Sequence, residues 1–201
     1  MSLYARMIIV LTSVGLLSGS FLATVGMLTK ERIALNIQRE IEGAIAHVIP
    51  GTVSSEKLYE EKDLTIYGGK DEDGAIIGFG ILASGVGFQD KIALMLGTNT
   101  SLTRTKKLRI IEQKETPGLG AKIEDDNAFL IFWENKDCSE SLSLRKPAAK
   151  TPEELSPMEI NTITGATISS ESVLKIINSS LVRVRELIEE KAFQIEEPDV
   201  N

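Results

Sequence analysis

The N-terminal part of the chain is an uninterrupted apolar segment. Residues 7–28 contain no charged side chain, and at about 1.5 Å rise per residue this stretch is roughly 33 Å long as a helix, enough to cross the hydrocarbon core of a membrane. It is longer than the apolar region of roughly 7–15 residues that is usual in signal peptides. The pattern therefore predicts a single-pass transmembrane anchor at residues 1–30.

Helical periodicity continues beyond this segment. Apolar residues keep helical spacing up to Pro50 and Gly51, which favour a helix end; they are Ile33, Ile37, Ile41, Ala44, Ile45 and Val48. Residues 31–50 are therefore predicted to form a helical stalk whose apolar stripe packs on the following domain. Within the anchor, small residues recur every fourth position, which favours packing against another transmembrane helix; they are Gly15, Gly19 and Ala23.

After residue 50 the pattern changes to short apolar runs separated by Gly and Asp, which is typical of strands joined by turns. Four runs predict strands of an antiparallel sheet: Leu64–Tyr67, Ala75–Leu82, Ile92–Leu96 and Lys107–Ile111. The periodicity of Asn127–Trp133 does not decide between helix and strand. Residues 136–160 are polar and contain three prolines, so they are predicted to form a surface loop.

The last pattern is an amphipathic helix. One apolar stripe follows Ser170, a residue type that favours a helix N-cap; it consists of Val173, Ile176, Ile177, Leu181, Val184 and Ile188. The predicted fold class is α+β, with a transmembrane helix and stalk followed by a domain at residues 51–195. That domain should hold a mainly antiparallel sheet and the C-terminal helix. Residues 196–201 are predicted to be an acidic tail.

Charge and composition narrow the function classes. The formal net charge is −7, and the chain after residue 30 holds 20 basic and 29 acidic residues. An acidic domain argues against nucleic acid as a partner. With one cysteine, Cys138, and one histidine, His47, an internal disulfide is excluded and a Cys/His metal site lacks ligands. His47 is predicted to lie at a helix C-terminus, with no catalytic motif around it.

Residues 164–170, Thr-Gly-Ala-Thr-Ile-Ser-Ser, precede the C-terminal helix directly. The free amides and positive dipole end of a helix N-terminus can hold a phosphate group. Gly165 and Ala166 leave room for a bulky ligand, and the hydroxyl of Thr167 can form a phosphoester. Taken alone, the segment is more simply explained as a helix cap that follows a turn glycine.

Residues 115–120, Glu-Thr-Pro-Gly-Leu-Gly, form the second notable segment. Pro117 restricts one backbone angle, whereas Gly118 and Gly120 can adopt conformations closed to other residues. Such a turn could present amides, a carboxylate and a hydroxyl to the edge of a flat heteroaromatic ring, with Leu119 against its face. A purely structural turn would have the same sequence features.

Together, and with Gly87–Gly97 before them, the two segments resemble the FMN-binding domain of the Rnf and Nqr respiratory complexes. They occur in the same order, and that family also has an N-terminal membrane helix. The resemblance covers roughly residues 60–185 and the anchor. Residues 114–122 are more similar to the RnfG protein of Rnf complexes than to the NqrC protein of Nqr complexes. Thr164 departs from the family pattern, where Ser or Asp is usual, but keeps a hydroxyl.

The resemblance implies a cofactor and its site. It implies FMN esterified to Thr167 within the Thr164, Gly165, Ala166 segment, and a turn that contacts the flavin ring through Glu115, Thr116, Gly118 and Leu119. It also implies a separate flavin transferase for maturation, other membrane subunits as partners, and electron transfer between ferredoxin and NAD coupled to Na⁺ or H⁺ movement. The expected location is the cytoplasmic membrane of the cell, with the FMN domain on the extracytoplasmic side.

Three alternatives stay open. A protein of the NqrC type would carry the same flavin but pass electrons towards quinone. A flavin protein that serves another reductase is the second alternative. A membrane scaffold protein without a cofactor is the third, and it predicts a colourless protein in which replacing Thr167 does not change electron transfer.

Overall fold

The computed structural model describes residues 2–193, except for the side chains of residues 31, 33 and 34. The chain divides into two compact units between Ile41 and Glu42, so the N-terminal part of the first helix and the compact domain are described separately. The acidic tail predicted at residues 196–201 lies outside the described residues.

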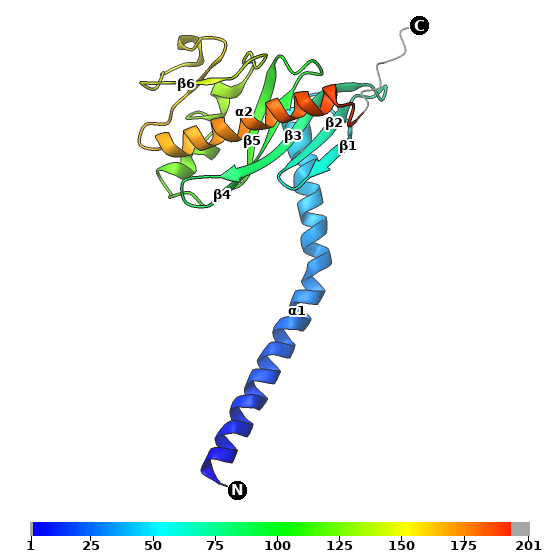
Figure 1. Cartoon of the computed structure of the whole chain (residues 1–201), viewed down its shortest axis with the longest axis vertical. Coiled ribbons are helices and arrows are strands. Elements are labelled where there is room, and N and C mark those ends of the chain that lie inside the picture. The colour runs from blue at the N-terminus through cyan, green and yellow to red at the C-terminus, as the bar shows by residue number, and fades with distance from the viewer. Residues whose placement is uncertain (1, 194–201) are drawn as a thin grey trace. The chain divides into compact units, whose positions relative to one another are not determined.

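The first helix, α1 (Leu3–Val48), is a single helix of 46 residues, as predicted for anchor and stalk together (Figure 1). It is long and apolar enough to cross a membrane by length and composition. Polar side chains in its apolar part bond to the helix itself: the hydroxyls of Ser13 and Thr24 donate to the carbonyls of Ile9 and Ser20 at 2.7 and 2.8 Å. Such bonds satisfy hydroxyls in surroundings that offer no water.

The last two turns of α1 belong to the compact domain. Ala44, Ile45 and Val48 are buried there, and so is Ile49, which follows the helix. The helix ends before Gly51, whose φ of +94° is readily adopted only by glycine. The predicted stalk is thus divided: the stripe is buried from Ala44 onwards, whereas Ile37 is 52% exposed.

Five antiparallel strands follow in the order β1-β2-β3-β4-β5. Their bounds are Ser54–Glu61, Leu64–Lys70, Ile76–Val86, Lys91–Thr98 and Thr105–Glu112. The four predicted strands correspond to β2 to β5. β1 was not predicted, because it is an edge strand with mostly exposed, polar side chains and pairs only with β2. Such a strand carries little hydrophobic alternation.

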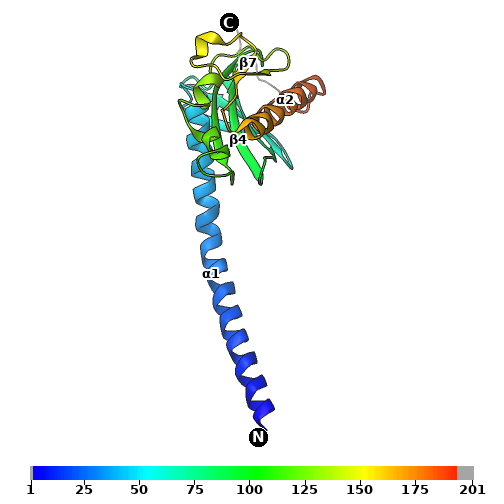
Figure 2. The same cartoon turned by 90° about the vertical axis from the view of Figure 1, so that its left-hand side faces the viewer.

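The two faces of this sheet bury different helices (Figure 2). Gly80 of β3 faces α1: a Cβ there would lie 3.6 Å from Ile45. Gly97, its neighbour on β4, leaves no room for a side chain beside the Val48 carbonyl. On the opposite face, Phe79, Ile81 and Ala83 lie in the main core, together with the apolar side of the C-terminal helix. Successive residues of β3 therefore point to opposite faces of the sheet, and the two helices pack on opposite sides of it.

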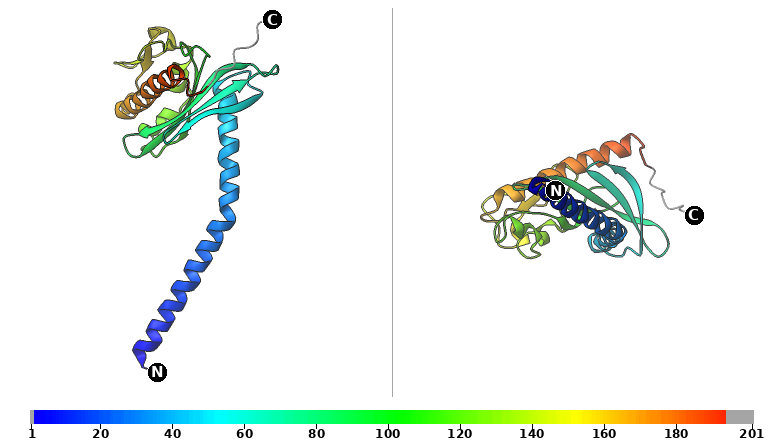
Figure 3. Two further views of the ribbon diagram at one scale, coloured as in Figure 1. Left: turned by 45° about the vertical axis from the view of Figure 1, so that its right-hand side comes forward. Right: turned by 90° about the horizontal axis from the view of Figure 1, so that it is seen from below.

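The C-terminal helix, α2 (Thr167–Glu189), runs along that second face of the sheet (Figure 3). Its buried residues include Val173, Ile177, Leu181 and Val184, as predicted. The predicted cap at Ser170 is wrong, because α2 starts at Thr167 and its N-cap residue is Ala166, four positions before Ser170. The Ser170 hydroxyl instead donates to the Ala166 carbonyl at 3.0 Å and accepts from the Ile163 amide at 3.2 Å.

The segment between β5 and α2 contains three short 3-10 helices, η1 (Gly120–Glu124), η2 (Leu130–Trp133) and η3 (Pro152–Glu154). It also contains a parallel pair of strands, β6 (Ser143–Arg145) and β7 (Glu159–Asn161). The undecided run Asn127–Trp133 thus ends in a 3-10 helix.

The surface loop predicted at residues 136–160 is only partly correct. This segment buries four apolar side chains and forms β6 and the start of β7; the four are Cys138, Leu142, Leu155 and Ile160. The amide side chain of Asn178 on α2 holds the Leu142 backbone through two bonds of 3.0 and 2.9 Å. The Asn178 side chain therefore provides hydrogen bonds that a neighbouring strand would otherwise provide. Apolar periodicity in the sequence does not predict such bonds.

Candidate functional site

The two segments singled out in the sequence lie side by side. The hydroxyl of Ser169 on α2 donates to Oε2 of Glu115 at 2.6 Å, across 54 positions of the chain. A Cβ added at Gly165 would lie 3.5 Å from Cδ2 of Leu119. The fold therefore brings the Glu-Thr-Pro-Gly-Leu-Gly turn against the first turn of α2.

The first turn of α2 is suited to an anionic ligand. Thr164 and Gly165 are exposed, Thr167 is half-buried, and Ala166 is 6% exposed. Gly165 has a φ of +83°, which allows the sharp entry into the helix. No side chain caps this helix start, and its first turn holds no acidic residue. The amides there lack intrahelical acceptors and lie at the positive dipole end, so a phosphate on Thr167 would be stabilised.

The Glu-Thr-Pro-Gly-Leu-Gly turn is exposed along its central residues. Gly118 has a φ of +77°, and the amides of Leu119 and Ala121 both donate to the Thr116 carbonyl at 3.1 Å. The Thr116 hydroxyl accepts a bond of 2.9 Å from Nε2 of Gln89. Leu119 is 51% exposed. The turn thus offers an apolar side chain beside the start of α2.

Glu115 differs from its neighbours because it is only 4% exposed. Its Oε1 accepts from the amides of Phe88 and Gln89 at 2.8 and 3.0 Å, while Oε2 accepts from Ser169. The carboxylate therefore bonds to the loop between β3 and β4 and to α2, although the sequence suggested that it faces the ligand. The sequence placed Ser169 and this loop in the segments that carry the resemblance, but it assigned neither to the site, because the helix was expected to start only after Ser170.

Four large apolar side chains are exposed on the segments that surround Thr167. They come from the end of β3, the β3–β4 loop, the turn and the first turn of α2: Val86 at 85%, Phe88 at 58%, Leu119 at 51% and Ile168 at 54% exposed. Exposed apolar surface beside polar amides is typical of a site for a flat, mostly apolar ligand.

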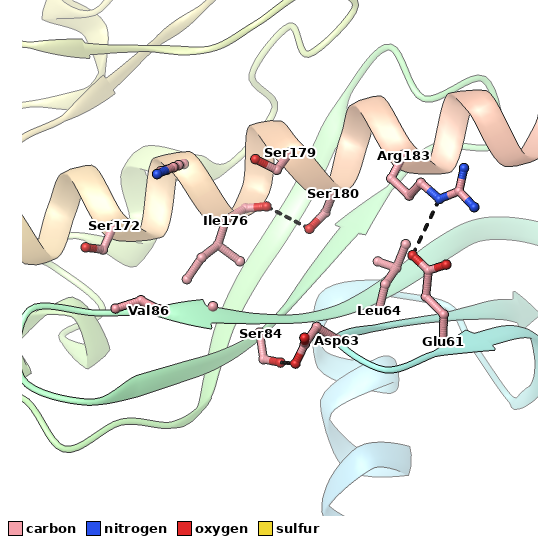
Figure 4. Close-up of a pocket in the computed structure, with 12 residues that line it drawn as sticks. Glu61, Asp63, Leu64, Ser84, Val86, Ser172, Ile176, Ser179, Ser180 and Arg183 are labelled. Atoms are coloured by element: carbon pink, nitrogen blue, oxygen red, sulfur yellow. Dashed lines mark hydrogen bonds and ion pairs between the residues drawn. The ribbon is translucent and has the colours of Figure 1, made fainter.

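A groove of about 390 Å³ opens between α2 and the ends of β2 and β3 (Figure 4). Ser172, Ile176 and Ser179 line it from the helix, and Val86 lines it from β3. At its far end Nε of Arg183 lies 3.5 Å from a Glu61 oxygen. Asp63 also lines it, and the pKa of its carboxyl is lowered by hydrogen bonds from Lys91 and Ser84. The predicted site residues do not line this groove, which starts beside the loop that Glu115 holds.

The chain's cysteine and histidine lie apart from this site. Cys138 is buried, and burial raises the pKa of its thiol to about 11, so little reactive thiolate forms near neutral pH. His47 lies in the last turn of α1, as predicted, and lines a cavity of about 210 Å³ with Asp126 and Glu134. Within residues 2–193, His, Cys, Asp and Glu side chains form no cluster of three or more that could hold a metal ion.

Residues 87–182 match the family model described as FMN-binding domain. This part of the chain therefore resembles an FMN-binding domain in sequence. The matched range begins at the β3–β4 loop and includes both the turn and the first turn of α2. The resemblance inferred from these segments is thereby confirmed for the family.

Two curated relatives are named as the G component of an ion-translocating oxidoreductase complex. The one from Methanosarcina acetivorans is 23% identical over 186 residues, covering 88% of this chain and 92% of the relative. The one from Buchnera aphidicola subsp. Baizongia pistaciae is 25% identical over 205 residues, covering 93% and 90%. Both alignments extend well beyond the FMN-binding domain.

A solved structure has a similar fold. The crystal structure of Shewanella oneidensis NqrC aligns with a TM-score of 0.53 at 18% sequence identity, over 65% of this chain and 66% of that one. The chain thus spans just under two thirds of that structure. The α+β class, with an antiparallel sheet and a C-terminal helix, is confirmed.

Proposed function

We propose that this chain carries FMN covalently on Thr167 and transfers electrons within a membrane-bound, Rnf-type ion-translocating oxidoreductase. The observation that supports this most is the meeting of the two predicted segments inside the matched FMN-binding domain. The two relatives from ion-translocating oxidoreductase complexes support the choice of complex, because their similarity extends over about nine tenths of the chain. The likeness to NqrC concerns the fold alone.

Residues at the start of α2 would hold the phosphate. Thr167 provides the ester oxygen, Gly165 and Ala166 keep the backbone uncovered, and the amides of the first turn stabilise the remaining negative charge. Thr164, exposed just before the helix, offers a further hydroxyl. The residues present therefore fit a phosphate-linked cofactor.

The ring would lie on the neighbouring apolar surface. Leu119 and Phe88 provide exposed side chains there, and Gly118 and Thr116 shape the turn beneath. When bound, FMN supplies the redox chemistry, whereas the protein supplies position and shielding. Because these side chains are half-exposed, an electron partner can approach the site closely.

Covalent attachment needs an activated flavin phosphate, which a flavin transferase would supply as a phosphoanhydride. The hydroxyl oxygen of Thr167 would form the bond to phosphorus while the anhydride bond breaks, and the leaving phosphate would take the electron pair. The hydroxyl proton would pass to a base of the transferase. This reaction changes no oxidation state, so it requires no oxidant.

The anchor explains the expected partners. Residues 7–28 of α1 would cross the cytoplasmic membrane and pack against other membrane subunits of the complex, with Gly15 and Gly19 on one contact face. The FMN domain would lie on the extracytoplasmic side, where the flavin transferase would act. Charges on both sides of the segment, Arg6 before and Lys30 after, do not by themselves set this orientation.

The full chain should be produced in membranes together with a flavin transferase. We expect flavin fluorescence on the denatured, gel-separated wild-type chain, no fluorescence for Thr167→Ala, and fluorescence for the neighbouring control Thr164→Ala. The loss should leave the fold intact, because Thr167 is not part of the core. A fluorescent Thr167→Ala chain would move the attachment elsewhere, and a non-fluorescent wild type would overturn the proposal.

A further inference from the structure

The carboxylate of Glu115 connects three segments that surround Thr167. It accepts two bonds from the β3–β4 loop, at Phe88 and Gln89, and one from Ser169 in the first turn of α2. It is itself the first residue of the Glu-Thr-Pro-Gly-Leu-Gly turn. No other side chain in the described residues 2–193 has hydrogen bonds that connect all three segments.

Two glycines leave space for this carboxylate. A Cβ at Gly87 would lie 2.5 Å from Oε1 of Glu115, and a Cβ at Gly120 would lie 2.6 Å from both Oε2 and the Ser169 hydroxyl. Real Cβ atoms do not approach oxygen so closely. Glycine at positions 87 and 120 therefore leaves the space that the buried carboxylate of Glu115 occupies.

Burying a carboxylate is costly unless donors satisfy it. Glu115 is 4% exposed, and its three donors are two amides and a hydroxyl. Its charge also lies beside the positive end of the α2 dipole. Because Ser169 follows Thr167 by only two residues, the bond to Glu115 constrains the turn that carries the attachment hydroxyl.

We propose that Glu115 is a positioning residue that fixes the hydroxyl of Thr167 relative to the β3–β4 loop and the turn. This inference rests on the proposed attachment of FMN to Thr167. The carboxylate oxygens of Glu115 accept hydrogen bonds from Phe88, Gln89 and Ser169. Its contribution is to the rate of attachment and to the surroundings of the attached ring, and Ser169 is its necessary partner.

The test uses the full chain in membranes with a flavin transferase. Glu115→Ala and Ser169→Ala remove the linkage from either side, while Glu115→Gln keeps it, because the amide oxygen accepts from both backbone amides and the amide nitrogen donates to Ser169. Glu112→Ala is the matched control, since that side chain is 69% exposed. Attachment is followed by intact mass over time. The attached flavin is then examined by its midpoint potential and visible circular dichroism.

We expect Glu115→Ala and Ser169→Ala to slow attachment by about tenfold to a hundredfold, the loss that a misplacement on the order of 1 Å can cause. Their attached flavin should show an altered circular dichroism spectrum and potential. Glu115→Gln should restore most of the rate, and Glu112→Ala should match the wild type. If Glu115→Ala does not fold, Ser169→Ala decides, because it removes one hydroxyl.

Attachment rates and flavin spectra equal to the wild type in Ser169→Ala would overturn the positioning role. Failure of Glu115→Gln to restore the rate would likewise contradict the hydrogen-bond assignment. Both results presuppose a wild type that carries flavin. A wild-type chain without flavin is a different result, which refutes the proposed function and this inference with it.

Discussion

The first turn of α2 and its later turns use the same helix in different ways. From Val173 to Leu187 the helix buries an apolar stripe against the sheet, whereas residues 164–168 leave Thr164, Gly165 and Ile168 exposed. The later turns fix where the helix lies. The first turn is therefore held by its neighbours while its backbone amides stay open to a ligand. A rigid helix with an uncovered start is what a phosphate-linked cofactor requires.

Replacing a side chain in the later turns should have the largest effect on folding. Leu181 is 1% exposed and lies in the main core, so Leu181→Ala should lower the free energy of unfolding by about 2–5 kcal/mol. Flavin attachment to the folded fraction should persist, because Thr167 is unchanged. Denaturant unfolding gives the first quantity and intact mass the second. A stability equal to the wild type would contradict the assigned packing.

The pH dependence of stability tests whether the Cys138 thiol is buried in the folded chain. Burial raises the pKa of this thiol to about 11 from 9.0, so the unfolded chain loses the thiol proton at lower pH than the folded chain. Stability should therefore fall as pH rises through the range from about 9 to about 11. Chemical unfolding across this range should show a smaller fall for Cys138→Ala. An identical pH dependence of the free energy of unfolding in Cys138→Ala would show that the thiol does not cause the fall.

Ile168, the exposed residue of the first turn of α2, should be the least sensitive to substitution. Ile168 is 54% exposed, so Ile168→Ser should change the free energy of unfolding by about 0.5 kcal/mol or less. Covalent attachment should continue, since neither Thr167 nor Ser169 is altered. Denaturant unfolding and intact mass measure these quantities, as for Leu181→Ala. A loss of stability as large as in Leu181→Ala would contradict the proposed difference between the first turn and the later turns of α2.

The sequence predicted the elements whose side chains are buried on one face. Short apolar runs separated by Gly and Asp identified β2 to β5, and the helical stripe identified α2, because buried elements need apolar side chains. The sequence did not reveal β1, whose exposed polar residues form no such run, or the start of α2, where no side chain acts as a cap. Residue types alone do not reveal the backbone pairing of an exposed strand or the start of a helix that has no side-chain cap.

The sequence singled out the two segments of the candidate site but not the hydrogen bonds that connect them. The two segments pointed to one pocket, and the structure brings Leu119 to Gly165. The role of Glu115 could not be predicted, because its partners are two backbone amides and a hydroxyl 54 positions away. A carboxylate in an exposed-looking turn gives no sign that it will be buried.

The most direct test of the account is peptide mapping of the mature chain, isolated from the membranes of its own cells. The account predicts that the peptide containing residues 164–170 is heavier by one FMN less one water, and that fragmentation places the added mass on Thr167. Recovery of that peptide without added mass, from protein that has met its flavin transferase, would contradict the central claim.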